Sequence, residues 1–173
     1  MNIYLLGFRA AGKSTLLQKI SFQGKKIDLD TELARDFGQS VLHFIQREGI
    51  EEFRKREFAK LSQLEMSSAK SPSLIAMGGG FVDWPASREL LLKSPSQRVF
   101  LRTPAALLWE RLKDQPERLI VGGIDSYEAF LALYESRQPY FERLATKVIE
   151  NTSLESSQAE IERWLFSALG FMK

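Results

Sequence analysis

The sequence predicts a three-layer α/β P-loop fold, in which a five-stranded parallel sheet is flanked by helices. Three observations support this prediction: strand-like apolar runs alternate with helix-like stretches, a phosphate-binding motif follows the first run, and other polar motifs follow later runs. Alternating strands and helices favour a parallel sheet that is covered on both faces. The 173 residues contain no internal repeat or long linker, so we expect a single domain over 1–173.

The order of the elements follows from the apolar runs. Strands are expected at 2–6, 26–28, 73–77, 98–102 and 146–149. Helices are expected near 13–20, 31–38, 41–47, 51–69, 104–114, 125–143 and 155–168. The carboxyl ends of parallel strands share one edge of the sheet, and open α/β folds bind ligands at that edge. Residues that directly follow a strand are therefore the first candidates for a functional site.

The loop between the first strand and the first helix carries the strongest functional signal. It contains the motif G-x-x-x-x-G-K-[ST] as Gly7-Phe8-Arg9-Ala10-Ala11-Gly12-Lys13-Ser14-Thr15. In such a loop, backbone N–H groups surround phosphate oxygens, the lysine reaches the β and γ phosphates, and the hydroxyl after it can bind Mg²⁺. The helix that runs on from Thr15 would add a positive N-terminus beneath the anion. The motif predicts that the chain binds a nucleoside triphosphate.

Two carboxylates follow the second strand, in the sequence Asp28-Leu29-Asp30. If this segment is extended, residues two apart point to the same side. One carboxylate would then serve Mg²⁺, directly or through water, and the other would serve the hydroxyl group of an acceptor. The alternative is structural, because an aspartate such as Asp30 could cap the helix expected from Thr31.

The helix expected before the third strand carries a carboxylate within an apolar stripe. Phe53, Glu57, Leu61 and Leu64 recur at helical spacing, and Arg54 lies one turn before Glu57. A partly buried carboxylate needs a partner, and Arg54 is the expected one. An arginine fixed in this way presents its remaining donors in a planar fork that suits a carboxylate ligand. Without the stripe, these charges would indicate an ordinary solvent-exposed helix face.

Three further features are ambiguous by themselves. Gly78-Gly79-Gly80 lets backbone N–H groups approach a ligand after the third strand, although a simple turn is the alternative. Arg118 lies in a polar segment at about 114–124, which fits either a lid that delivers charge to a phosphoryl group or a surface loop. Arg137 lies in a helix with Pro139 and, taken alone, looks like an exposed arginine.

Composition excludes several classes of protein. The formal net charge of +2 gives no electrostatic argument for binding nucleic acid or a membrane surface. The chain has no cysteine and a single histidine, His43, so disulfides, thiolate metal sites and a Ser/His triad are not expected. No apolar run reaches the ~20 residues of a membrane span. The first strand begins almost at once and leaves no room for a signal peptide, so we expect a cytoplasmic protein.

Together, the motifs resemble those of the shikimate kinase family. They are G-x-x-x-x-G-K-S-T, D-x-D, G-x-x-x-F-R-x-x-E at 49–57, A-M-G-G-G at 76–80 and R-x-P-Y at 137–140. The match runs over nearly the whole chain, and the pairing of F-R-x-x-E with the triple glycine makes it specific. The resemblance implies a nucleoside-monophosphate-kinase-like fold with a substrate-binding segment at about 30–60 and a lid. It implies a monomer that phosphorylates the 3-hydroxyl of shikimate with ATP, giving shikimate 3-phosphate and ADP on the pathway to chorismate and the aromatic amino acids.

The same resemblance implies roles on the nucleotide side. Lys13 and Ser14 would hold phosphate and Mg²⁺, and Asp28 would assist the metal. Arg111 resembles the arginine that packs on adenine. Arg118 would be the lid arginine that stabilises the charge of the transferring phosphoryl group.

On the acceptor side, the resemblance assigns the aspartate and the two arginines. Asp30 would bind hydroxyl groups of shikimate and would orient, or deprotonate, the attacking one. Arg54, Arg137 and the backbone within Gly78-Gly79-Gly80 would hold the carboxylate of shikimate, with Glu57 steadying Arg54. The arginine pair indicates an acid but does not identify its carbon skeleton, so a kinase of another small hydroxylated acid remains an alternative.

Two of the departures from the family pattern concern the phosphate loop and the lid. Ala10 stands where relatives often have glycine, which matters if the backbone there has a positive φ. Arg118 is followed by Leu119-Ile120-Val121 instead of the usual Pro-Leu-Leu. The altered lid is the feature that favours a third alternative, a nucleotide-binding module without catalytic activity.

Overall fold

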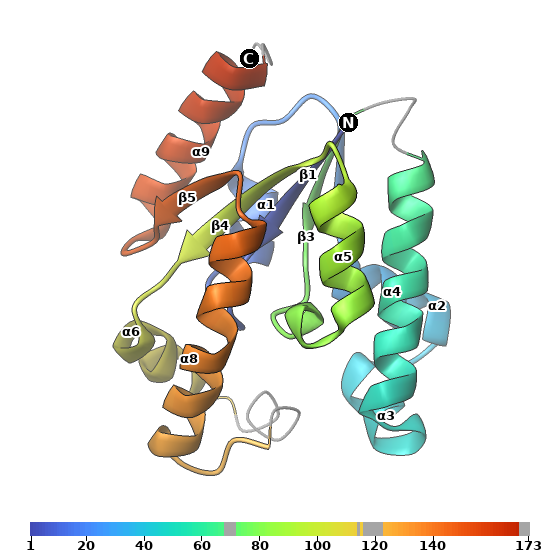
Figure 1. The fold of residues 1–173 in the computed structure, drawn as a ribbon. Coiled ribbons are helices and arrows are strands. Elements are labelled where there is room, and N and C mark those ends of the chain that lie inside the picture. Colours follow the sequence, from blue (N-terminus) through green and yellow to red (C-terminus); the bar gives the residue numbers. More distant parts are fainter. Residues whose placement is uncertain (68–71, 114, 116–122, 170–173) are drawn as a thin grey trace.

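Five parallel strands form the centre of the computed structural model, which describes residues 1–67, 72–113, 115 and 123–169 (Figure 1). The order across the sheet is β2-β3-β1-β4-β5, and every neighbouring pair is parallel. The strands are β1 (Asn2–Leu6), β2 (Lys25–Asp28), β3 (Ser73–Ala76), β4 (Gln97–Arg102) and β5 (Lys147–Glu150). The predicted parallel sheet is confirmed, and each strand boundary lies within about one residue of the expected position.

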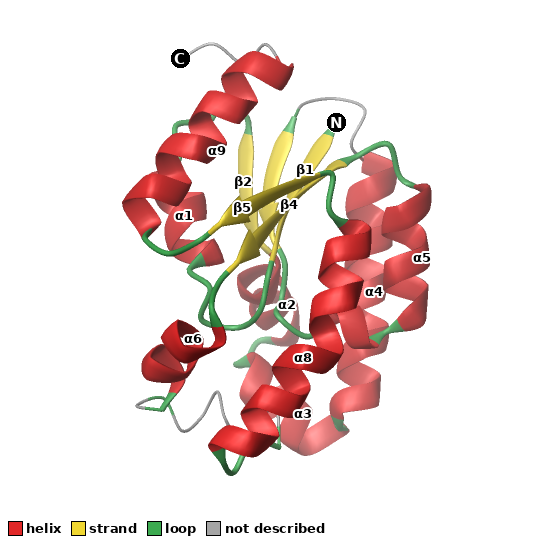
Figure 2. Cartoon of the chain, turned by 60° about the vertical axis from the view of Figure 1, so that its left-hand side comes forward, coloured by secondary structure: helices red, strands yellow, loops and turns green. Residues whose placement is uncertain are grey.

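Helices connect the strands and cover both faces of the sheet (Figure 2). They are α1 (Lys13–Lys19), α2 (Leu29–Phe37), α3 (Val41–Glu48), α4 (Ile50–Ser67), α5 (Pro85–Lys93), α6 (Ala105–Leu112), α8 (Tyr127–Leu144) and α9 (Leu154–Leu169), with a 3₁₀ turn η1 (Phe81–Asp83). Within the described ranges, none of these helices is both long and apolar enough to cross a membrane.

The sequence prediction missed η1 and α5. Only Ser87 and Leu91 of α5 are buried, so its apolar pattern is too sparse to indicate a helix. A start signal was nevertheless available, because Pro85 occupies the first turn, where proline is favoured. Helix α8 continues through Pro139 as one element.

Alternate residues of the central strand pack against two separate cores. Ile3 and Leu5 of β1 point to the face covered by α1 and α9, whereas Tyr4 and Leu6 point to the face covered by α4, α5 and α8 (Figure 2). This alternation follows from the period of two along a strand. All five residues of β1 are buried. The loop after β1 therefore leaves a rigid support near the middle of the carboxyl edge of the sheet.

Candidate active site

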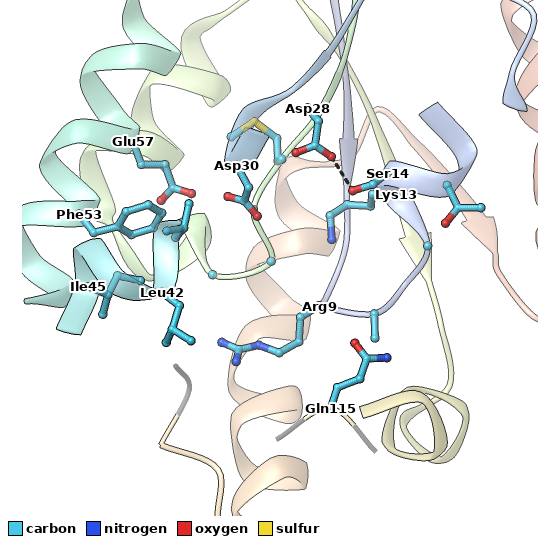
Figure 3. Close-up of a pocket in the computed structure, with 18 of the residues that line it drawn as sticks. Arg9, Lys13, Ser14, Asp28, Asp30, Leu42, Ile45, Phe53, Glu57 and Gln115 are labelled. Atoms are coloured by element: carbon cyan, nitrogen blue, oxygen red, sulfur yellow. Dashed lines mark hydrogen bonds between the residues drawn. The ribbon is translucent and has the colours of Figure 1, made fainter. Parts of the chain in front are cut away.

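A cavity of about 580 Å³ opens at the carboxyl edge of the sheet (Figure 3). The phosphate loop, the aspartates at the end of β2 and the start of α2, the glycines after β3, and Arg54 and Glu57 of α4 all line it. The structure thus brings segments that follow three different strands into one cavity. Residues 114 and 116–122 of the predicted lid, Arg118 among them, lie outside the described residues.

The phosphate loop is braced from two sides. Lys13 is largely buried, and its Nζ donates hydrogen bonds to the carbonyl oxygens of Gly7 and Phe8, both at 2.9 Å. From the end of β5, the fully buried Asn151 donates through Nδ2 to the carbonyl oxygen of Ala11 and to Oγ1 of Thr103, both at 2.7 Å. Asn151 directly follows β5, so it lies at the carboxyl edge of the sheet, where the sequence predicted a ligand site.

Ala10 adopts a conformation that favours glycine. Its φ is +62°, and among the residues that the structure describes it is the one residue other than glycine with a positive φ. The loop therefore requires a left-handed residue at position 10, where relatives often have glycine. Nη1 of Arg111, the residue predicted to pack on adenine, donates to the carbonyl oxygen of Ala10 at 3.1 Å and so supports this turn.

Asp28 and Asp30 do not share an extended segment, because β2 ends at Asp28 and α2 begins at Leu29. Asp28 is the N-cap of α2: its Oδ1 accepts from the backbone N–H of Thr31 at 3.1 Å, and its Oδ2 accepts from Oγ of Ser14 at 2.5 Å. The capping role that the sequence allowed for Asp30 therefore belongs to Asp28. Asp30 lies in the first turn of α2, with its carboxylate at the cavity (Figure 3).

The predicted pair between Arg54 and Glu57 is confirmed, with Nη1 of Arg54 donating to Oε2 of Glu57 at 2.6 Å. Burial raises the pKa of Glu57 to about 7; Arg54 opposes this shift, and the negative charges of Asp30 and Asp83 add to it. Oε1 of Glu57 has no hydrogen-bond partner among the described residues. A Cβ at Gly78 would come within 2.7 Å of this oxygen and 2.9 Å of Oδ1 of Asp30, so this glycine makes room for both carboxylates.

The raised pKa of Glu57 predicts a pH dependence of stability. Because the folded protein binds this proton more tightly than the unfolded chain, the contribution of Glu57 is fully present below about pH 4.5 and is lost as pH rises through about 7. A pKa shift of one unit corresponds to about 1.4 kcal/mol, so the free energy of unfolding falls by at most roughly 3 kcal/mol over this range. Urea unfolding of the wild type and Glu57→Gln at pH 5 to 8 measures it. The wild type should lose stability relative to the variant; a difference that is constant with pH would contradict the assignment.

Arg137 lies behind Gly80 and is not among the residues that line the cavity within the described chain. Its sequence context suggested exposure, but only 4% of its side chain is exposed, because α8 packs it onto the ring of Phe8. Nε and Nη2 of Arg137 both donate to the carboxylate of Asp83, the first at 2.9 Å. A Cβ at Gly80 would overlap Nη2 of Arg54 and come within 3.2 Å of Nη2 of Arg137.

Sequence reasoning missed three contributors to this site. Asp83, in η1, pairs with Arg137, and its position shortly after the triple glycine was the only available signal. Arg9 was treated as a variable position of the phosphate-loop motif, but its side chain extends into the cavity (Figure 3). Leu42, Ile45 and Phe53 form an apolar wall opposite the phosphate loop, which suits one face of a small ring (Figure 3).

Comparisons with known proteins agree with this geometry. A family model described as shikimate kinase matches residues 9–166. The shikimate kinase of Enterococcus faecalis is 32% identical over 88% of this chain and 89% of its own length, and that of Streptococcus gordonii is 35% identical over 87% and 90%. Among solved structures, shikimate kinase from Acinetobacter baumannii in complex with shikimate superposes with a TM-score of 0.81 at 26% identity, covering 96% of this chain and 93% of that one.

Proposed function

The chain belongs to the shikimate kinase family of ATP-dependent phosphotransferases, and we propose how its residues divide the work of moving the γ-phosphoryl group of ATP to the 3-hydroxyl of shikimate. The observation that carries the proposal is that the phosphate loop and the Arg54–Glu57 pair face one cavity, with Asp30 between them. Phosphoryl transfer needs little covalent chemistry from the protein, so positioning and charge stabilisation would provide most of the catalysis.

On the nucleotide side, the loop of Gly7, Ala10, Ala11, Gly12 and Thr15 would surround the phosphates with backbone N–H groups. Lys13 would supply the buried positive charge of this loop, and Arg111, which borders it, would pack on adenine. The lid arginine of this proposal, Arg118, lies outside the described residues.

The same side of the cavity fits Mg²⁺. Oγ of Ser14 and Oδ2 of Asp28 lie 2.5 Å apart at its wall, so both hard oxygen donors can serve one ion, Asp28 directly or through water. Mg²⁺ in kinases takes most of its ligands from phosphates and water, so one or two protein oxygens suffice. When bound, the ion would neutralise charge on the phosphates.

On the acceptor side, α2, α3 and the first half of α4 would form the substrate-binding segment. Asp30 would accept the hydrogen bond of the attacking hydroxyl and thereby orient it toward the phosphate loop. Arg54, held by Glu57, would bind the carboxylate of shikimate together with the backbone at Gly79 and Gly80 and with Arg137, which lies directly behind Gly80.

Replacing Asp30 by asparagine should lower kcat by about 10²- to 10⁴-fold, the range for loss of a positioned acid–base group. The affinity for ATP should change little, because Asp28 and Ser14 remain. Steady-state kinetics across pH 5 to 9 measures both effects. Asp36→Asn is the matched control, since Asp36 lies in the same helix but does not line the cavity. Its Oδ2 pairs with Nζ of Lys60 at 2.7 Å. An Asp30 variant with unaltered kcat and pH profile would rule out both orienting and proton-accepting roles.

The acceptor itself is tested by ADP release from Mg-ATP with shikimate, quinate or gluconate added. We expect strong stimulation by shikimate alone, because the cavity combines an apolar wall with an arginine and a carboxylate at fixed positions. Equal stimulation by another acid would favour the alternative kinase. Nucleotide binding without stimulation by any acceptor would favour the non-catalytic module.

A further inference from the structure

The arginines proposed to hold the carboxylate of shikimate already hold a carboxylate of this chain. Asp83 bonds to Arg137 through both of its oxygens, Oδ1 to Nε at 2.9 Å and Oδ2 to Nη2. Oδ2 of Asp83 also lies 3.7 Å from Nη2 of Arg54. One carboxylate thus lies between the two guanidinium groups, which is the arrangement that an acidic ligand would adopt there.

The second donor edge of Arg137, formed by Nη1 and Nη2, is closed by burial. Nε and Nη2 form the edge that Asp83 uses, and Nη1 is buried without a hydrogen-bond partner in the described chain. A second carboxylate therefore finds no exposed pair of donors on Arg137 while Asp83 is in place. Nη1 of Arg54 is likewise occupied by Glu57.

Above about pH 7, where Glu57 is ionised, the local charges are also balanced without a ligand. Two guanidinium groups, Arg54 and Arg137, face two carboxylates, Glu57 and Asp83. An anionic acceptor gains little attraction from such a set unless one carboxylate withdraws. Glu57 is 1% exposed and fixed within α4, whereas the side chain of Asp83 is 42% exposed. Asp83 is therefore the carboxylate that can turn into solvent.

We infer that Asp83 is an intramolecular competitor of the acceptor carboxylate, which binds the arginine pair in the ligand-free protein and is displaced when shikimate binds. This inference rests on the proposed function, since it takes shikimate as the acceptor. Asp83 thereby sets the affinity for the acid without touching the reacting atoms. If Asp83 is paired with the arginines in about nine tenths of the ligand-free molecules, only about one tenth can bind the carboxylate of shikimate. The apparent affinity for shikimate is then about tenfold weaker than that of the unpaired state.

Asp83→Asn tests the inference because it removes the charge but keeps one oxygen that can accept from Nε of Arg137. Titration calorimetry without nucleotide should show shikimate binding about tenfold more tightly to the variant than to the wild type. The KM for shikimate should fall in parallel, and the KM for ATP should stay within about twofold. Methyl shikimate, which lacks the charge, should bind equally to both proteins.

Glu142→Gln is the matched control, because Glu142 is an exposed carboxylate that pairs with an arginine, Arg102, at 3.4 Å. It should leave shikimate affinity unchanged. Unchanged or weaker binding of shikimate by Asp83→Asn would overturn the inference, and weaker binding would identify Asp83 as a residue that positions Arg137. An equal gain for the methyl ester would overturn it as well, since the competition requires a carboxylate.

The wild-type protein provides a test that does not depend on how the variant folds. In a crystal structure with bound shikimate, Asp83 should no longer bond to both Nε and Nη2 of Arg137; persistence of both bonds would overturn the inference. The same titrations separate the two proposals. No binding of shikimate by either protein would contradict the proposed function together with this inference, whereas binding without a gain in Asp83→Asn would contradict this inference alone.

Discussion

Replacing Lys13 by methionine should lower kcat with shikimate by about 10²- to 10³-fold, the range for removing one preorganised charge from a transition-state site. Lys13 provides a largely buried cation within the phosphate loop, where charge acts more strongly than at the surface. Methionine keeps an unbranched apolar stem but loses the charge of Lys13 and its bonds to Gly7 and Phe8. Single-turnover rates at saturating ATP and shikimate measure the loss in the chemical step.

Lys26→Met is the matched control for this variant. Lys26 is exposed on β2, and its Nζ also donates to a backbone carbonyl, that of Gln18, at 3.0 Å. It should retain wild-type kcat. A Lys13 variant that folds normally by circular dichroism, binds ATP and retains more than about a tenth of wild-type kcat would contradict the role of Lys13 in transfer.

Replacing Arg54 by lysine should raise the KM for shikimate by about 10²-fold and leave the KM for ATP within about twofold. Lysine keeps the positive charge but not the planar fork, so it cannot bond to Glu57 and to a substrate carboxylate in the same geometry. Truncating one partner of a buried charge pair costs about 2–5 kcal/mol, and lysine should recover part of that loss. Initial rates with each substrate varied in turn separate the two KM values.

Arg56→Lys is the control, because Arg56 lies on the exposed side of the same helix and pairs with Glu52 at 2.8 Å. Its kinetics should match those of the wild type. Equal increases in both KM values for Arg54→Lys would refute a carboxylate-binding role and would indicate a general disturbance of the cavity.

Features of the fold and the site could be predicted from the sequence where the interacting residues lie close together along the chain. The strands and most helices follow from apolar periods within short windows, so they could be predicted. The Arg54–Glu57 pair was also predictable, because its members lie three residues apart on one helix. Asp83 was not, because its partner Arg137 is 54 residues away and only the packing of α8 beside η1 brings them together.

The same reasoning explains the error at Asp30. Two aspartates separated by one residue are compatible with an extended pair and with a helix start, and the sequence alone does not determine where β2 ends. Asp28 ends the strand and caps α2, whereas an extended pair would require the strand to continue through Asp30, two residues further on. The local geometry therefore differed from the prediction, while both carboxylates still reached the cavity.

Phosphoryl transfer by this protein is tested by following the labelled γ-phosphoryl group of ATP in the presence of Mg²⁺ and shikimate. We predict that the label appears in shikimate 3-phosphate in equal amount to the ADP formed, and that little appears as inorganic phosphate. Label released as phosphate at a rate independent of shikimate would contradict the account, because the protein would then hydrolyse ATP without transferring its phosphoryl group.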